Sequence, residues 1–270
     1  MLDGLRVLLA EDNPTNQMVA TQMLESLGAS VTIANDGAEA LEIVETGDFD
    51  LILVDIEMPR VSGIELLRRL RARGDSLAEK PMVALTAYVM REHRAAIAAA
   101  GADGVIAKPI LSIEQFGSEI RRYMHKRPAP SAKPPGHPGA SVHGTDAAGP
   151  NADALAVPVI DRGIYDTLAE TIGPTAMDEL LEKVVSDTQN ALDRLIHAED
   201  PLDLDEIRAV SHILISVAGA IGGQRVQDAA KAVNAAAQQA DNAATAEHLP
   251  RLTGNIRDML AQISEQASAR

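Results

Sequence analysis

The sequence predicts two structural parts, an α/β part with a doubly wound, five-stranded parallel sheet and an all-α antiparallel helical bundle. Short apolar runs alternate five times with segments of helical periodicity up to residue 126, which is typical of a doubly wound sheet. From residue 159 onward only helical patterns follow, separated by short polar loops. Residues 128–158 are rich in Pro, Gly and Ala, without apolar periodicity. We therefore expect domains at 1–127 and 159–270, joined by a flexible linker at 128–158.

The strands are expected where short apolar runs end in polar or small residues, at 5–10, 31–33, 51–55, 81–86 and 103–107. The run at 51–55 is continuously apolar until Asp55, which is typical of a strand buried on both faces of a parallel sheet. Pro59 stops this segment.

Each strand is followed by a helical pattern, at 14–27, 38–45, 64–70, 91–100 and 110–126. Pro14 suits the first turn of the first of these helices, and Gly28 ends it. In the bundle, helices are expected at 164–172, 177–198, 204–222, 226–240 and 249–267, with Gly, Pro, Asp or Asn between them.

Composition excludes several classes of function. The formal net charge of −15 argues against general binding to nucleic acid or to an anionic membrane, because both require basic surface. The absence of cysteine excludes disulfides and thiolate chemistry. No signal-peptide pattern and no apolar stretch of membrane-spanning length is present, so a cytoplasmic protein without membrane insertion is expected.

Polar residues stand at the carboxyl ends of four predicted strands. Glu11 and Asp12 follow the first strand, Asp55 ends the third, and Thr86 and Lys108 close the fourth and fifth. In one parallel sheet these ends meet at the same edge. Three carboxylates together favour a hard divalent cation, most plausibly Mg²⁺. A carboxylate beside such a cation can attack a phosphoryl group, with a hydroxyl and an ammonium group on its oxygens.

Residues 5–127 resemble a response-regulator receiver domain, which has a flavodoxin-like fold. The motifs that match are the acidic pair Glu11/Asp12, then Asp55 with Met58, Pro59 and Gly63, then Thr86-Ala87 and Lys108-Pro109. The resemblance implies that Asp55 accepts phosphate from a phosphohistidine. It also implies Mg²⁺ on Asp12, Asp55 and the backbone carbonyl of Glu57, and a cis Lys108–Pro109 bond. The run from Glu11 to Asn16 looks most like receivers of hybrid kinases and phosphorelays.

One position departs from the receiver pattern. Val105 stands where the family often has Tyr or Phe, so the usual coupling between threonine and an aromatic side chain is in question. As a hypothesis, Tyr88 lies over the pocket instead and slows hydrolysis of the acyl phosphate.

A histidine occupies the polar side of the predicted helix 204–222. The apolar stripe of this helix consists of Ile207, Val210, Leu214, Val217 and Ile221. His212 points roughly opposite to the stripe, and most of its neighbours are small. We therefore expect an exposed histidine that another protein's active site can reach; the alternative is an ordinary surface histidine.

Residues 161–263 resemble a histidine-phosphotransfer (HPt) domain in the order and spacing of their apolar residues. By that resemblance His212 is the phosphoryl carrier. The family usually has Lys-Gly directly after His-x-Leu, whereas this chain has Ile215-Ser216. We expect Ile215 to be exposed and to suit protein contact, and Arg208, one turn before His212, to supply the missing charge.

The sequence thus indicates a two-component phosphorelay protein in which Asp55 accepts phosphate and His212 accepts or relays it. It is not a turnover enzyme, because a receiver catalyses only its own phosphorylation and dephosphorylation. Expected partners are a histidine kinase, other receivers or HPt proteins. Two alternatives stay open, a binding module that docks on a kinase or receiver without transfer, and a phosphate sink that drains a relay. The direction of flow, the oligomeric state and the docking of the two domains are also open.

Overall fold

The computed structural model describes residues 2–87, 91–110, 112–124 and 157–268. The linker expected at 128–158 lies outside these residues except for its last two. Within the described ranges the elements are, in chain order, β1 Arg6–Ala10, α1 Pro14–Ser26, β2 Ser30–Ala34, α2 Gly37–Ile43, β3 Leu51–Asp55, α3 Gly63–Arg71, η1 Ser76–Glu79, β4 Met82–Thr86, α4 Arg91–Ala99, β5 Gly104–Ala107, α5 Ile113–Met124, α6 Arg162–Ile172, α7 Pro174–His197, α8 Leu204–Ala220, α9 Gln224–Gln238 and α10 Asn242–Ser268.

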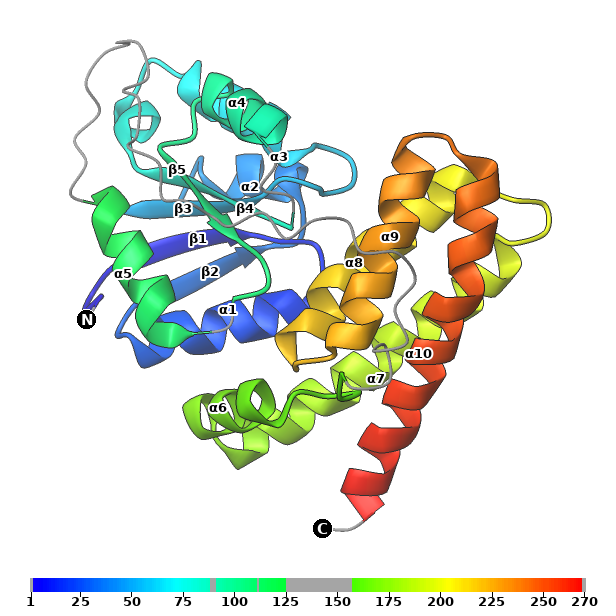
Figure 1. Cartoon of the computed structure of the whole chain (residues 1–270). Coiled ribbons are helices and arrows are strands. Elements are labelled where there is room, and N and C mark those ends of the chain that lie inside the picture. Colours follow the sequence, from blue (N-terminus) through cyan, green and yellow to red (C-terminus); the bar gives the residue numbers. More distant parts are fainter. Residues whose placement is uncertain (1, 88–90, 111, 125–156, 269–270) are drawn as a thin grey trace.

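The first part is a five-stranded parallel sheet with the strand order β2-β1-β3-β4-β5. Helices α1 and α5 cover one face, and α2, α3 and α4 cover the other (Figure 1). Strands β3 and β4 are buried along their whole length, as a continuous apolar run requires in a sheet covered on both faces. The predicted doubly wound α/β fold is confirmed.

Helix starts follow local capping chemistry. The Asn13 side chain accepts a hydrogen bond from the backbone N–H of Asn16, and Pro14 occupies the first turn of α1. Helix α5 begins at Ile113 rather than at residue 110, because the Ser112 hydroxyl accepts from the backbone N–H of Gln115 at 3.2 Å.

Helix α10 begins at Asn242, two turns earlier than the sequence pattern predicted. Pro250 lies inside it and removes one backbone hydrogen bond. Leu249 and Leu252 on either side are buried, so packing against the bundle stabilises the helix across the proline.

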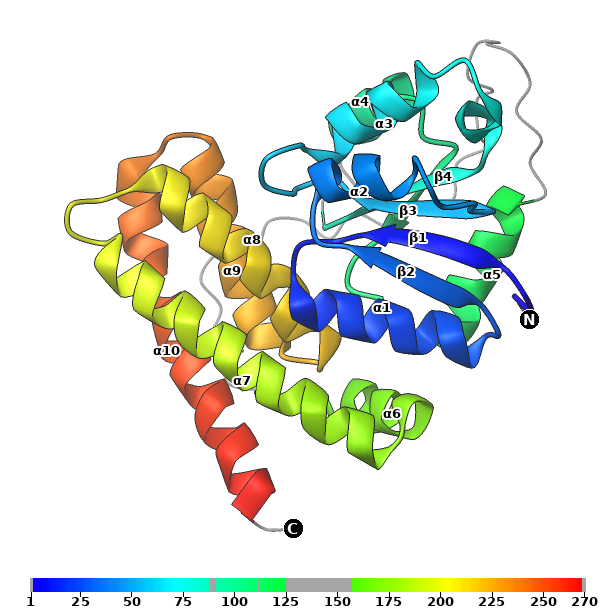
Figure 2. The same cartoon turned by 180° about the vertical axis from the view of Figure 1, so that it is seen from behind.

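Helices α6 to α10 form the second part, in which α8 packs on α7 and α9, and α10 packs on α7 and α9 (Figure 2). This confirms the predicted helical bundle. None of the helices in the described residues is long and apolar enough to cross a lipid bilayer.

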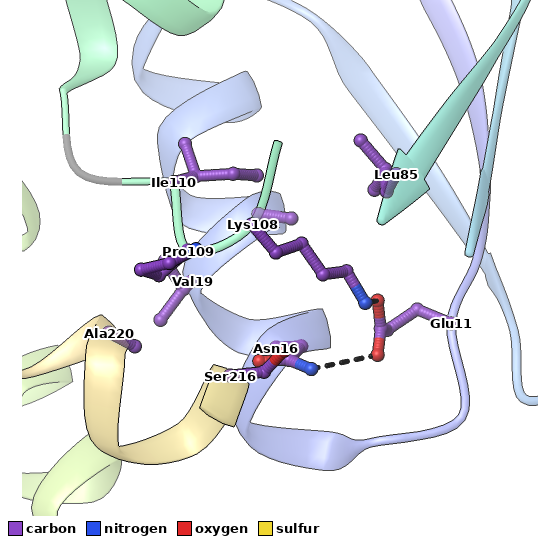
Figure 3. A pocket seen from close by; sticks show the side chains of 10 residues that line it. Glu11, Asn16, Val19, Leu85, Lys108, Pro109, Ile110, Ser216 and Ala220 are labelled. Carbon is purple, nitrogen blue, oxygen red and sulfur yellow. Dashed lines mark hydrogen bonds and ion pairs between the residues drawn. The ribbon is translucent and has the colours of Figure 1, made fainter. Parts of the chain in front are cut away.

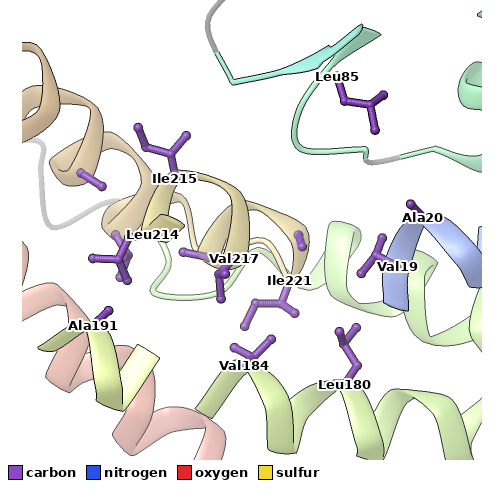
Figure 4. Packing of buried hydrophobic residues seen from close by; sticks show 14 of the residues in the cluster. Val19, Ala20, Leu85, Leu180, Val184, Ala191, Leu214, Ile215, Val217 and Ile221 are labelled. Carbon is purple, nitrogen blue, oxygen red and sulfur yellow. The ribbon is translucent and has the colours of Figure 1, made fainter. Parts of the chain in front are cut away.

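The two parts are packed against each other. Helix α1 contacts α6, α7 and α8, and these helices lie side by side in both views (Figures 1 and 2). The hydrophobic cluster on the α1 side of the sheet continues into the bundle, so that Val19 and Ala20 of α1 belong to the same cluster as Ile215 of α8 and its C-cap residue Ile221 (Figure 4). The cluster under α2 and α3 is separate. The α1 face is therefore the face that meets the bundle.

Candidate functional site

The predicted carboxylates meet at one edge of the sheet. Glu11, Asp12 and Asp55 each offer a carboxylate oxygen within 4.8 Å of the others. Glu11 is 1% exposed and Asp55 is 2% exposed. Thr86, also buried, ends β4 at the same edge, and the backbone N–H of Lys108 donates to its carbonyl at 2.8 Å. The structure thus brings together the receiver residues expected from the sequence.

Lys108 is the cation of this cluster. Its Nζ lies 2.5 Å from Glu11 Oε2 and 2.7 Å from Asp55 Oδ2. The Asn16 side-chain amide donates to Glu11 Oε1 at 3.0 Å (Figure 3). The Lys108–Pro109 bond is cis, as the resemblance implied. Lys108 and Asn16 therefore bind the two oxygens of the Glu11 carboxylate. The ammonium group of Lys108 also contacts Asp55, the carboxylate expected to accept phosphate.

The carboxylates repel one another in a buried setting. Burial and the nearby charge of Asp55 raise the pKa of Glu11 from 4.5 to about 8 and that of Asp12 from 3.8 to about 6. For Lys108, burial opposes the charged form, but Asp55 and Glu11 outweigh it and raise the pKa, so the ammonium stays protonated. One lysine does not neutralise three carboxylates.

This donor set fits a magnesium ion. All three side chains offer hard oxygen ligands within reach of one another, and the excess negative charge is largely buried. Glu57, whose carbonyl the resemblance adds as a ligand, follows in the next loop, where its backbone N–H donates to Asp55 Oδ1 at 3.3 Å. The cluster is therefore able to hold a metal ion.

Without a divalent cation, the protein should lose thermal stability as the pH rises from about 5 to about 8. In the unfolded chain Glu11 and Asp12 lose their protons near 4.5 and 3.8, whereas in the folded chain they keep them to about 8 and about 6. The folded state then binds more protons across this range, so its stability is highest below the unfolded values and falls as the pH passes the folded ones.

Magnesium should reverse this loss. At a concentration one hundred times its Kd, a cation that binds only the folded state adds about 2.7 kcal/mol to the free energy of unfolding. The melting temperature with and without Mg²⁺, at matched ionic strength, is the measurement. The rise should be larger at the alkaline end of the range, and equal rises at both ends would contradict the assignment of the cluster.

His212 lies differently from the prediction. It was expected to be exposed, but it is 9% exposed, and its Nδ1 lies 3.0 Å from Glu57 Oε2. The reason is that the helix face opposite the apolar stripe packs against the first part of the same chain, the part that contains the sheet. His212 and Ser216 of α8 line the same cavity as Asp12 and Asp55. The histidine thus faces the acidic cluster of its own chain.

The ring of His212 is neutral at physiological pH. Burial lowers its pKa from 6.5 to about 4; the charge of Asp55 opposes this shift and that of Lys108 adds to it. Glu57 does not restore the proton, because burial and Asp55 raise the pKa of its own carboxyl to about 7, so this carboxyl is only partly charged. A neutral imidazole keeps a nitrogen lone pair available for nucleophilic attack.

Ile215 was predicted to be exposed, and this is also wrong. It is 1% exposed and belongs to the hydrophobic cluster shared by both parts (Figure 4). Arg208 is exposed on the rim of the cavity, 3.6 Å from Asp205 Oδ1, and its charge lowers the pKa of Glu57. The charge of Arg208 therefore acts on Glu57, which lines the same cavity as His212.

The prediction from sequence missed three side chains at this site. The Glu57 carboxylate contacts His212, Arg194 of α7 lines the cavity, and Asp187 of α7 contacts the start of α1. The only signal for Glu57 was its place two residues after Asp55. Arg194 and Asp187 carry no sequence signal, because charges on the polar face of a helix usually face solvent.

Two sequence hypotheses concern the switching of the receiver. Val105 is half-buried in β5, and the Tyr123 hydroxyl donates to its carbonyl at 3.4 Å. Tyr88 lies outside the described residues, so its proposed place over the pocket stays a prediction.

Comparison with known families identifies the first part. The family model of the response regulator receiver domain matches residues 7–120. The receiver domain of a sensor histidine kinase from Pseudomonas aeruginosa PAO1, solved with a magnesium ion in its active-site cleft, is 34% identical; the match covers 46% of this chain and 99% of that one, with a TM-score of 0.43.

Curated relatives match over more of the chain. The aerobic respiration control sensor protein ArcB of Escherichia coli K12 is 27% identical over 98% of this chain and 31% of its own length. The virulence sensor protein BvgS of Bordetella pertussis is 28% identical over 96% of this chain and 20% of its own length. The chain thus spans about a third of the first relative and a fifth of the second. Because the family match coincides with the buried acidic cluster at the edge of a parallel sheet, residues 7–120 form a response regulator receiver domain of two-component signal transduction.

Proposed function

We propose that this chain is a phosphorelay protein in which Asp55 accepts a phosphoryl group from a phosphohistidine and His212, on an HPt-like bundle, accepts or passes it. The observation that supports the proposal is the shared cavity, in which a buried, neutral His212 faces the cluster that contains Asp55. That Asp55 and His212 line one cavity supports transfer between them.

In the first step an oxygen of Asp55 attacks the phosphorus, and the bond from phosphorus to the donor's histidine nitrogen breaks. Lys108, already 2.7 Å from Asp55, is placed to pair with the phosphoryl oxygens, and the Thr86 hydroxyl at the end of β4 is the second expected donor. Asp12, Asp55 and the Glu57 carbonyl, with Glu11 beside them, would hold Mg²⁺, which would supply positive charge that offsets the phosphoryl group.

In the second step a ring nitrogen of His212 attacks the phosphorus of phospho-Asp55. A nitrogen–phosphorus bond forms, the oxygen–phosphorus bond breaks, and the Asp55 carboxylate leaves. Because the imidazole is neutral, no proton has to be removed before the attack. The reverse reaction uses the same groups, so the geometry serves flow in either direction.

The proposal extends to the organisation of the chain. Domain boundaries at 1–127 and 159–270 separate the receiver from the bundle, and the expected outside partners are a histidine kinase, another receiver or another HPt protein. These partner classes are inferred by analogy with ArcB and BvgS, and this chain matches only part of the length of each.

The test uses the full chain. It is incubated with a small-molecule phosphodonor and Mg²⁺, and the label is followed over time. A base-labile label expected on Asp55 should appear first, followed by an acid-labile, base-stable label on His212. Absence of the base-stable label at every time point would contradict a carrier role for His212.

Arg208 should assist the transfer. Its charge reaches Glu57 across the cavity, so it is placed to support a phosphoryl group between Asp55 and His212. Arg208→Ala should slow formation of the His212 label by about tenfold while leaving the Asp55 label unchanged. Arg225→Ala, which removes an arginine of α9 bonded to Asn255 and Asp258, serves as the control. If the His212 label forms at the same rate in wild type and in Arg208→Ala, Arg208 does not assist the transfer.

The docked bundle also favours a second function. It packs over the receiver, buries His212 and places Ile215 where HPt domains usually have lysine. A bundle that transfers no phosphate would still limit access to Asp55, and the chain would then be a phospho-regulated binding module. The label experiment separates the two functions, because only a carrier acquires the base-stable label.

A further inference from the structure

A polar contact joins the two parts of the chain outside the reacting groups. Asp187 of α7 accepts a hydrogen bond from the Thr15 hydroxyl through Oδ2 at 2.7 Å, and the Asn13 side-chain amide donates to the same oxygen at 3.4 Å. Thr15 is 0% exposed, and Asp187 is half-buried. A carboxylate from the bundle thus meets two donors at the first turn of α1.

This contact differs in kind from the apolar part of the interface. The apolar cluster that includes Val19, Ala20 and Ile215 is non-directional, so any receiver with an apolar α1 face would satisfy it. A half-buried carboxylate is satisfied only by donors at the right place. A receiver without a hydroxyl at the position of Thr15 would leave Asp187 poorly paired, and this cost disfavours the wrong partner.

We infer that Asp187 is a specificity determinant that directs the bundle to this chain's own receiver by pairing with Thr15 and Asn13. The partner of the bundle is then the receiver part of the same chain, docked with His212 over the acidic cluster. Outside receivers compete only when they offer the same two donors. The role of Asp187 in docking depends only on its contact with Thr15 and Asn13. Its role in phosphoryl transfer rests on the proposed function.

Docking is measured in the full chain through the reactivity of His212. Diethyl pyrocarbonate modifies accessible, neutral imidazoles, and peptide mass spectrometry resolves His212 from the other six histidines of the chain. Docking buries His212, so its modification should be slow in wild type. Asp187→Ala should speed it by about tenfold, the size expected for loss of a hydrogen bond to a charged group.

Matched variants sharpen the measurement. Asp193→Ala removes an exposed carboxylate from the same helix and should leave the modification rate unchanged. Thr15→Val should speed modification as Asp187→Ala does, whereas Thr15→Ser keeps the hydroxyl and should behave as wild type. Asp187→Asn, which keeps the shape of the side chain, repeats the test if the alanine variant does not fold.

The double variant tests the pairing itself. Because Asp187→Ala already removes the hydrogen bonds from both Thr15 and Asn13, adding Thr15→Val should make the double variant no more reactive than Asp187→Ala alone. Effects that multiply, or a wild-type rate in Asp187→Ala, would overturn the inference.

Transfer is measured separately with the small-molecule phosphodonor. In Asp187→Ala the Asp55 label should form normally, and the His212 label should form more slowly in proportion to the docked fraction that the modification experiment gives, which changes by a smaller factor than the modification rate. If wild type forms no His212 label, the relay proposal fails while the modification experiment still decides the role of Asp187. Normal transfer in an undocked Asp187→Ala chain would show that docking does not limit the reaction.

Discussion

Asp55→Asn is expected to abolish phosphorylation of the chain by a small-molecule donor. The amide keeps the shape of the side chain but is a much weaker nucleophile than the carboxylate, and loss of a nucleophile lowers rates by more than about a thousandfold. No label should then reach His212 either, because in the proposed relay the phosphoryl group passes to His212 from Asp55, and both residues line the same cavity. Phosphate-affinity electrophoresis of wild type and variant is the measurement.

The control for this variant lies at the opposite end of the same strand. Asp50 precedes β3 and pairs with Arg6, away from the acidic cluster, so Asp50→Asn should be phosphorylated like wild type. A substantial label on Asp55→Asn would show that another residue accepts the phosphoryl group.

Retention of the fold in Asp55→Asn can be checked through its response to pH. Asp55 raises the pKa of Glu11, Asp12 and Glu57, so its removal should lower these values. The melting temperature of the metal-free variant should therefore fall less between about pH 5 and pH 8 than that of wild type. Loss of activity with this altered pH response indicates a folded protein that lacks its acceptor.

The receiver fold and its acidic cluster were predictable because they follow from local patterns. A continuous apolar run ending in Asp55 indicates a strand buried on both faces, and parallel strands place their carboxyl ends at one edge. Glu11 and Lys108 are 97 residues apart in sequence, yet this rule brings them to the same edge of the sheet, where they lie 2.5 Å apart. The pattern in the sequence did not predict the order of the strands in the sheet, which the structure supplies.

The environment of His212 was not predictable in the same way. Helical periodicity identified the face that points away from the bundle core, but it says nothing about what covers that face. The cover comes from α1 and from the loop after β3, more than 150 residues earlier in the chain. Burial of Ile215 has the same cause, since its apolar side chain belongs to the cluster that crosses between the two parts.

Charged residues on α7 show the same limit. In the sequence, Asp187 and Arg194 resemble the solvated charges of any amphipathic helix. Only the packing of α7 on α1 places Asp187 against Thr15 and Arg194 beside the cavity. Side chains that act across an interface have no periodic signature, because their partners lie in another part of the chain.

His212→Gln is expected to remove the base-stable label completely while leaving the Asp55 label intact. Glutamine retains polar atoms near Glu57 but has no nucleophilic ring nitrogen. Phospho-Asp55 should therefore accumulate to a higher level than in wild type, because its outlet to the bundle is closed. A time course of both labels in the full chain measures the two effects together.

The accumulation of phospho-Asp55 is the more informative of these two results, because it separates the two proposed functions. A carrier histidine drains Asp55, so its removal raises the base-labile label. A bundle that only covers the site drains nothing, and His212→Gln would then leave that label at the wild-type level. His197→Gln provides the control, since this histidine is exposed at the end of α7, away from the acidic cluster, with its Nδ1 2.7 Å from the Asp193 carbonyl oxygen. Because the covering helices are retained in both variants, a rise confined to His212→Gln would have to come from the lost nucleophile and not from altered access to Asp55.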